Sequence, residues 1–157
     1  MSRRVAIIQG CRTPFARAGS ELSRMSGVQL GTVAVRELIN RAEIDPKEVE
    51  HLIFGTVVPS IPAPNVSREV GLEAGLPPTA PAFTVSRACA SSNQAITSGA
   101  EAIMAGQADV VVAGGVEFLS DVPMLLSRGL RDALLSASKA KSAAARVKAL
   151  VGVRPRH

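Results

Sequence analysis

Aromatic residues are nearly missing from this sequence, which has no Trp, no Tyr and four Phe among 157 residues. Proteins that bind single-stranded nucleic acid without sequence preference stack the bases on exposed aromatic rings. The composition therefore argues against that class, and no nucleic-acid partner is expected. With 46% hydrophobic residues the chain can still bury a core, built mainly from Ala, Val, Leu and Ile. Its length suits one globular domain.

Cysteine is scarce as well. Two cysteines in a chain of this length do not make a disulfide framework. No cluster of Cys, His, Asp and Glu has metal-ligand spacing, so no metal site is expected. The apolar run at residues 5–8 is shorter than the apolar region of a signal peptide, and no run is long enough to span a bilayer. We expect a cytoplasmic protein with free thiols.

Basic charge is confined to one end of the chain. Residues 1–127 carry 10 basic and 12 acidic side chains, whereas residues 128–157 carry 8 basic and 1 acidic. The apolar residues of this last segment recur every three or four positions, so it is predicted to form a basic amphipathic helix that ends at Gly152 and Pro155. Such a helix suits a weak contact with an anionic membrane or with the phosphates of a ligand, although a solvated helix fits equally well.

The remaining residues show short apolar runs that alternate with helical patterns, which indicates an α/β fold with a mainly parallel, mixed sheet and helices on both faces. The strands are expected at residues 5–8, 52–58, 82–85 and 108–113, the last one ended by Gly114 and Gly115. The helices are expected at residues 30–42, 66–74 and 88–106, with a further helix start at Asp45 and Pro46. We therefore predict one domain over residues 1–120 and a basic helical segment over residues 121–157.

Cys89 lies where the third expected strand gives way to a helix. Unpaired backbone N–H groups and the positive end of the helix dipole favour a thiolate at such a position, and they can also hold the oxyanion of an acyl transfer. Arg87 lies two residues away. A free cysteine more often packs as a small hydrophobe, so the local layout alone leaves both interpretations open.

The helix expected after Cys89 is apolar or small on all sides, with Glu101 as its only charge. A helix of this kind has to be covered all round, and one sheet covers only one side. We expect a further part of a protein, or a partner, to cover the other side; the alternative is an Ala-rich helix of small residues that tolerates exposure. The other chemically interesting residues are interpreted as structural or as surface groups: Cys11, His51, Glu117, Asp121 and the turn at Gly114 and Gly115.

Three segments resemble the thiolase family, and they occur in the family's order. Residues 11–15 (Cys-Arg-Thr-Pro-Phe) resemble its early loop. Residues 85–96 (Val-Ser-Arg-Ala-Cys-Ala-Ser-Ser-Asn-Gln-Ala-Ile) resemble its nucleophile segment, and residues 109–120 resemble its fourth strand and the following Gly-Gly-x-Glu-x-x-Ser turn. Ser86 and Ser92 depart from the Asn and Gly that are common there. The likeness covers nearly the whole chain and is greatest to the thiolase (β) subunit of fatty-acid β-oxidation complexes.

The resemblance implies an acyltransferase that cleaves 3-ketoacyl-CoA, with Cys89 as the acylated nucleophile and coenzyme A as co-substrate, not as a tightly bound cofactor. It also implies a homodimer and an association with a hydratase/dehydrogenase α-subunit. Thiolases are longer, and their Gly-His-Pro and Cys-x-Gly segments have no counterpart among these 157 residues. We therefore expect a fragment that is inactive by itself. A biosynthetic acetoacetyl-CoA thiolase and a non-catalytic interaction module remain the alternatives.

Overall fold

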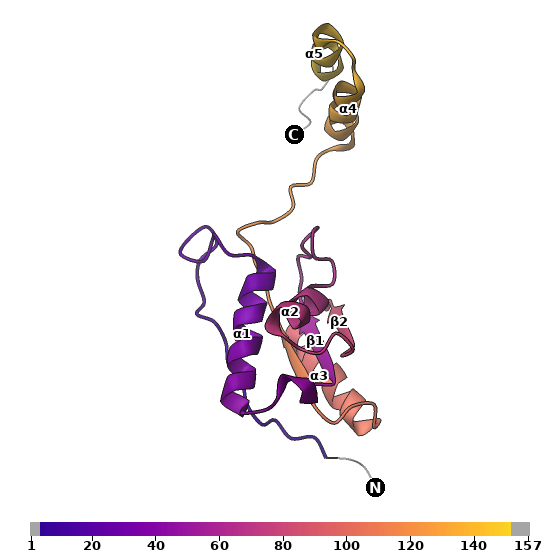
Figure 1. Cartoon of the computed structure of the whole chain (residues 1–157). Coiled ribbons are helices and arrows are strands. Elements are labelled where there is room, and N and C mark those ends of the chain that lie inside the picture. The colour runs from indigo at the N-terminus through magenta and orange to yellow at the C-terminus, as the bar shows by residue number, and fades with distance from the viewer. Residues whose placement is uncertain (1–3, 152–157) are drawn as a thin grey trace. The chain divides into compact units, whose positions relative to one another are not determined.

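A parallel β-sheet forms the centre of the first of two compact units, Met1–Val122 and Pro123–His157. The structure is a computed structural model that describes residues 4–151. The sheet consists of β1 (His51–Gly55), β2 (Ala82–Val85) and β3 (Val111–Gly115) in the order β2-β1-β3 (Figure 1). Both pairings are parallel, with Phe54 opposite Thr84 and Gly114. All three strands thus end at the same edge, and the predicted α/β class is confirmed.

The helix α2 (Val66–Ala74) packs on one face of the sheet, and α1 (Gly27–Ala42) packs against α2 and contributes to the same core. A capping box between Ser26 and Gln29 starts α1. A core of branched and aromatic side chains fills the space between these helices and the sheet: Val35, Ile39, Val49, Leu52, Phe54, Val66, Val70, Leu76 and Val112. The helix predicted at Asp45 is a single 3₁₀ turn, η1 (Pro46–Glu48), which the Asp45 carboxylate caps through the N–H of Lys47.

The helix α3 (Ser91–Met104) packs against all three strands. Its inner face is small, because a Cβ on Gly99 would come within 3.0 Å of the Val111 side chain. Its outer face is open: Ile96 is 47% and Met104 52% exposed. The prediction that the sheet covers only one side of this helix is therefore confirmed for the described residues.

One of the predicted strands is absent, and two others have different bounds. Residues 5–8 form no strand, and Ile7 and Ile8 are 86% and 80% exposed. An apolar strand needs a pairing neighbour and cover on both faces, and the described residues supply neither at this place. The strand β1 stops at Gly55, because the Glu117 carboxylate binds the backbone N–H groups of Val57 and Val58 in place of a neighbouring strand.

The strand β3 begins three residues later than predicted and includes Gly114 and Gly115, which pair with Phe54 and Gly55. The two glycines therefore extend the strand, and the prediction that they end it was wrong. The mixed sheet of the sequence prediction also requires an antiparallel strand. The described residues contain only parallel pairings.

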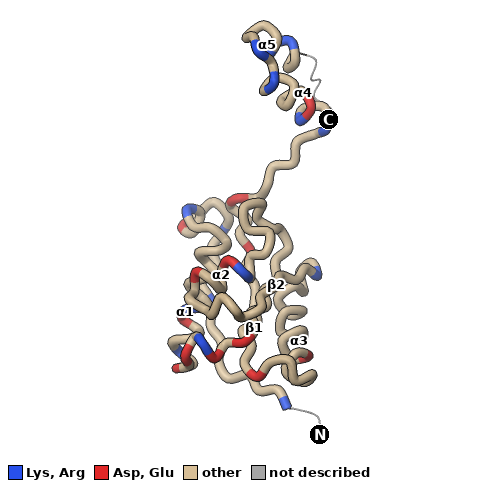
Figure 2. Tube along the Cα trace, turned by 45° about the vertical axis from the view of Figure 1, so that its right-hand side comes forward, with Lys and Arg blue, Asp and Glu red and all other residues tan. Residues whose placement is uncertain are grey.

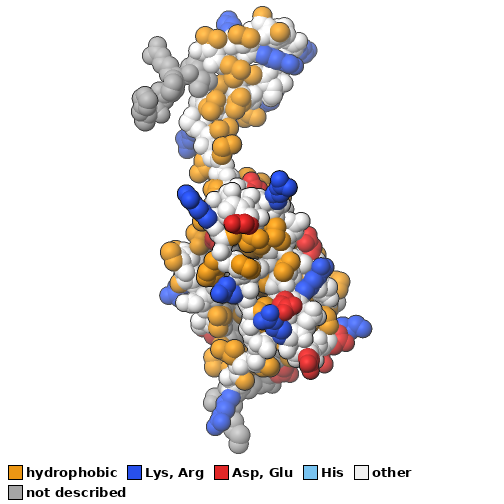
Figure 3. Space-filling view, turned by 90° about the vertical axis from the view of Figure 1, so that its left-hand side faces the viewer, with side chains coloured by type: hydrophobic (Ala, Val, Ile, Leu, Met, Phe, Trp, Pro, Cys, Tyr) orange, Lys and Arg blue, Asp and Glu red, His pale blue; other side chains and the backbone are white. Residues whose placement is uncertain are grey.

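The second unit contains two helices, α4 (Arg128–Lys139) and α5 (Ala143–Val151), where one continuous helix was predicted. The break occurs because Ala140 is extended, with ψ 130°, and Ser142 starts the next helix by accepting the N–H of Ala145. Lys and Arg recur along this unit (Figure 2), and exposed hydrophobic side chains lie among them (Figure 3). The predicted ends at Gly152 and Pro155 lie outside the described residues. No helix within residues 4–151 is long and apolar enough to cross a membrane.

Candidate functional site

The Cys89 thiol is exposed on the turn that joins β2 to α3. The helix begins at Ser91 with Ala90 as its N-cap, so it starts three residues later than predicted. Cys89 consequently precedes the helix by two residues instead of belonging to its first turn. The strand–turn–helix layout expected from the sequence is present, and Cys89 is exposed on it.

Backbone strain marks the residue immediately before the cysteine. Ala88 has a φ of 46°, in the left-handed region, where a residue with a Cβ costs roughly 1–2 kcal/mol. The N–H of Ala90 donates to Arg87 O at 3.0 Å, and the N–H of Ser91 donates to Ala88 O at 3.1 Å. Such a conformation persists only where the surroundings determine it, and strained residues of this kind cluster at functional sites. The motif alone did not predict this strain.

A buried hydroxyl spans the same turn. Ser91 is 4% exposed, and its Oγ accepts the N–H of Arg87 at 2.8 Å and donates to Ala88 O at 2.7 Å. Sequence reasoning did not single out Ser91, and its position two residues after the cysteine gave no signal of a role. Only the folded turn shows that this oxygen lies between the Arg87 N–H and the Ala88 carbonyl.

Two glycines at the strand ends lie directly beneath the start of α3. A Cβ on Gly55 would lie 2.3 Å from the carbonyl carbon of Ser91, and one on Gly115 would lie 2.2 Å from Ser92 Oγ. Contacts this short leave room only for hydrogen at both positions. The sheet edge therefore fixes where the helix begins, and with it the place of the Cys89 turn.

The N-terminus of α3 has no side-chain cap, because Ala90 occupies the N-cap position. Alanine is a poor N-cap, so this arrangement costs helix stability. It leaves the backbone N–H groups of the first turn without a competing side-chain acceptor, and their partial positive charge suits an oxyanion or thiolate. The Arg87 guanidinium is directed to this helix as well, because it donates to Gln94 Oε1 at 2.8 Å.

Side chains of the turn after β3 accept hydrogen bonds from the backbone of two neighbouring loops. The Glu117 carboxylate accepts the N–H groups of Val57 and Val58 at 2.7 and 3.0 Å. Ser120 Oγ accepts the N–H of Gly19 at 3.0 Å. Glu117 was predicted to be a surface charge, and it is exposed, but its carboxylate also satisfies two backbone donors. The fixed spacing of Glu and Ser after Gly-Gly was the available signal.

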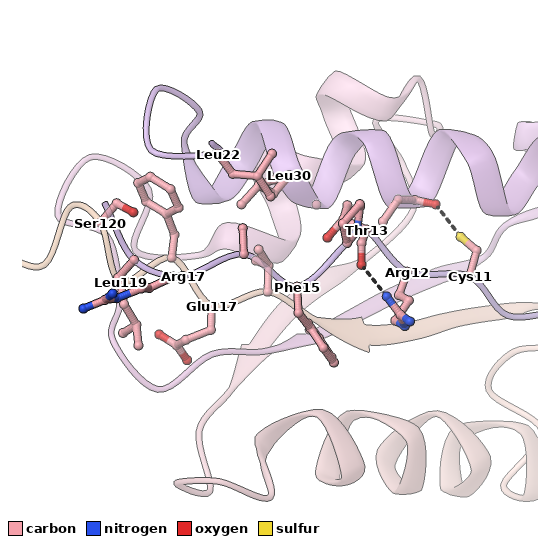
Figure 4. Close-up of a pocket in the computed structure, with 18 residues that line it drawn as sticks. Cys11, Arg12, Thr13, Phe15, Arg17, Leu22, Leu30, Glu117, Leu119 and Ser120 are labelled. Carbon is pink, nitrogen blue, oxygen red and sulfur yellow. Dashed lines mark hydrogen bonds between the residues drawn. The ribbon is translucent and has the colours of Figure 1, made fainter. Parts of the chain in front are cut away.

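A pocket of about 330 Å³ lies between the loop at residues 11–18, α1 and the turn at residues 115–120 (Figure 4). Cys89 does not line it. Cys11 does, and its Sγ donates to Ala34 O at 3.2 Å, as the dashed line in Figure 4 shows. The half-buried Cys11 thus has the structural role expected of it. No three His, Cys, Asp or Glu side chains within residues 4–151 are grouped to hold a metal ion.

Comparison with known proteins finds relatives that match most of the chain. Residues 5–153 match the family model described as "Thiolase, N-terminal domain". The 3-ketoacyl-CoA thiolase of Vibrio cholerae is 44% identical over 94% of this chain and 34% of its own length. The mitochondrial trifunctional enzyme subunit beta of Homo sapiens is 43% identical over 89% of this chain and 30% of its own length. The chain thus spans about a third of these relatives.

Solved structures agree with the sequence comparison. The thiolase Acat5 of Ascaris suum in complex with coenzyme A has a TM-score of 0.72 and 34% identity, over 74% of this chain and 31% of that one. The acetyl-CoA acetyltransferase of Bacillus anthracis has a TM-score of 0.67 and 36% identity, over 70% and 28%. With a matching family model over nearly its whole length, this chain belongs to the thiolase family.

Proposed function

We propose that this chain carries the nucleophilic part of a degradative thiolase, with Cys89 as the residue that is acylated. The observation that carries the proposal is the exposed Cys89 thiol on a strained turn ahead of an uncapped helix N-terminus. A cysteine in such an electropositive and accessible place is typical of catalytic thiols. The high identity to a protein named 3-ketoacyl-CoA thiolase supports this assignment.

The proposed reaction has two steps. The Cys89 thiolate attacks the 3-keto carbon of a 3-ketoacyl-CoA, and the bond between C2 and C3 breaks. Its electron pair leaves with C2 of acetyl-CoA, which takes up a proton, while the acyl group remains on Cys89 as a thioester. The thiol of free coenzyme A loses its proton and attacks this thioester, which releases a shortened acyl-CoA and regenerates the thiolate. The N–H groups at the start of α3 are suited to hold the carbonyl oxygen as charge develops on it.

The acid and base for these proton transfers are not apparent near Cys89. The family resemblance assigns them to a Gly-His-Pro and a Cys-x-Gly segment, which do not occur among these 157 residues. General acid–base assistance contributes about 10²–10⁴-fold to typical reactions. We therefore propose that this chain by itself is acylated slowly and does not turn over.

A mass measurement of the intact chain tests this proposal. After incubation with acetoacetyl-CoA or a long-chain 3-ketoacyl-CoA, we expect less than one equivalent of acyl group on Cys89, and none in Cys89→Ser. Absence of any Cys89 adduct would contradict the nucleophile assignment. Multiple turnovers on adding coenzyme A, abolished by Cys89→Ser, would contradict the proposed need for the second set of residues.

The choice of substrate separates the two enzymatic alternatives. We propose the degradative reaction, because the relatives at 43–44% identity are named 3-ketoacyl-CoA thiolase and trifunctional enzyme subunit beta. The biosynthetic alternative is supported by the likeness to an acetyl-CoA acetyltransferase at 36% identity. Faster acylation by a long-chain substrate than by acetoacetyl-CoA is expected, and the reverse order would favour the biosynthetic thiolase.

The partners follow from the same relatives and remain part of the proposal. We propose that the complete protein dimerises and associates with a hydratase/dehydrogenase subunit, because a relative at 43% identity is named as a subunit of a trifunctional enzyme. The third alternative, an interaction module without catalysis, predicts such association with no acylation of Cys89. Co-purification together with the mass measurement therefore distinguishes it from both enzymes.

A further inference from the structure

The Cys89 turn is closed by one side chain that the proposed mechanism does not use. We infer that Ser91 is a positioning residue: its hydroxyl holds Ala88 in the left-handed conformation and thereby fixes the direction of the Cys89 thiol. This inference rests on the proposed nucleophilic role of Cys89, and it assigns a function to a buried residue that acts through its neighbours in the turn.

The geometry of the two hydrogen bonds shows what the hydroxyl does. Its oxygen accepts from the Arg87 N–H at 2.8 Å and donates to Ala88 O at 2.7 Å. These two groups flank all four φ and ψ angles of Arg87 and Ala88. One oxygen therefore fixes the distance between the Arg87 nitrogen and the Ala88 carbonyl oxygen. The backbone between these two atoms includes the strained φ of 46° at Ala88. Because the chain continues directly into Cys89, the same constraint aims the thiol.

The hydroxyl serves the turn and not the helix. A serine at a helix start ordinarily accepts an N–H group from the first helical turn and so stabilises the helix. The Ser91 oxygen instead reaches back to Arg87, and α3 has no side-chain cap. Ser91 is also only 4% exposed and its backbone lies against Gly55, so it cannot easily leave this place. The arrangement closes the turn and places no side-chain acceptor on the N–H groups of the first helical turn.

Alkylation of the two cysteines in the intact 157-residue chain tests the inference, because Cys11, which is hydrogen-bonded to α1, is an internal reference thiol. Brief labelling with iodoacetamide and peptide mass spectrometry give the ratio of the Cys89 rate to the Cys11 rate. In Ser91→Ala we expect this ratio to fall about fivefold, the equivalent of one lost hydrogen bond. The freed turn leaves the left-handed conformation and carries the thiol away from the N–H groups of α3.

Ser67→Ala is the matched control. Ser67 is fully buried, and its Oγ donates to Leu52 O at 2.9 Å in the core on the opposite face of the sheet. This variant should lower the melting temperature and leave the ratio of the two rates unchanged. An equal fall of the ratio in Ser67→Ala would show that general destabilisation is responsible, and the inference would be overturned. An unchanged ratio in a folded Ser91→Ala chain would overturn it as well.

A second variant separates the conformation of Ala88 from other effects of the hydroxyl. Glycine adopts positive φ without steric cost, so Ser91→Ala should matter little once Ala88 is glycine. We expect the ratio in Ala88→Gly/Ser91→Ala to stay within about twofold of that in Ala88→Gly, less than one hydrogen bond is worth. This comparison also serves if Ser91→Ala alone does not fold. A full fivefold loss in the glycine background would contradict the inference.

Acylation of Cys89 by an acyl-CoA, measured on the same samples, keeps the two proposals apart. If the wild-type chain is never acylated but the alkylation ratio responds to Ser91 as expected, the thiolase assignment fails and the positioning role stands. If acylation occurs and is equally fast in Ser91→Ala, the thiolase assignment stands and the positioning role fails.

Discussion

At the scale of the single residue, the two cysteines have different surroundings. Cys89 is exposed ahead of a helix N-terminus, whereas Cys11 is half-buried and donates to Ala34 O. We expect iodoacetamide to label Cys89 faster, on the order of tenfold, because exposure and an electropositive setting both favour attack by the thiolate. Mass spectrometry after brief labelling near neutral pH gives the two rates. Equal or reversed rates in folded protein would contradict the electropositive setting of Cys89, and unfolded material would label both thiols alike.

The residue scale also offers a sharp test of the contact between the sheet and α3. Gly55→Ala places a methyl group 2.3 Å from the Ser91 backbone, which cannot yield as a flexible side chain would. We expect a loss of about 1–3 kcal/mol in the free energy of unfolding, measured by urea denaturation. Gly114→Ala is the control one strand away, because its methyl group would meet Phe54 at an ordinary 3.6 Å. Equal losses in the two variants would show that the close contact is not the cause.

At the scale of helices and strands, the unit that contains α4 and α5 is expected to bind anionic surfaces. Helices α4 and α5 carry exposed Leu134, Leu135 and Val147 among six basic side chains and one acidic one in residues 123–151. We expect weak, salt-sensitive binding to anionic lipid vesicles, since each basic residue near such a surface is worth about 1 kcal/mol. Co-sedimentation with anionic and neutral vesicles measures it. A chain ending at Ser127 is the control. Equal binding by both chains would show that residues 128–157 do not bind the vesicles.

Local signals predicted the bounds of some elements well. Both α2 and β2 have the residues predicted for them, because Asn65 caps the start of α2 and Gly75 ends it with a φ of 89°. The prediction failed where the outcome depends on distant residues. Residues 5–8 have an apolar strand pattern and no pairing neighbour, and β1 ends early because Glu117, far along the sequence, binds the following N–H groups. The position of Cys89 between a strand and a helix was predictable, whereas the hydrogen bonds of Ser91 to the Arg87 N–H and the Ala88 carbonyl were not.

At the scale of the whole chain, the open face of α3 should control association. Ile96 and Met104 on this face, together with Ile7 and Ile8, are exposed hydrophobic side chains. We expect the isolated chain to self-associate and to bind the dye ANS, because exposed apolar surface of this kind favours contact with other molecules. Sedimentation velocity measures the association, and Ile96→Lys should weaken it. A monomer with a sharp thermal transition and no dye binding would contradict this prediction.

The turn at residues 115–120 has a consequence for the order in which the chain folds. Glu117 binds backbone groups 59 and 60 residues earlier, Ser120 binds Gly19 across 101 residues, and Gly115 lies under the start of α3. Contacts between such distant residues form late, because closing long loops costs chain entropy first. During synthesis Cys89 is therefore made well before the segment that completes its surroundings. The electropositive setting of the Cys89 thiol is therefore assembled only after residues 115–120 have left the ribosome.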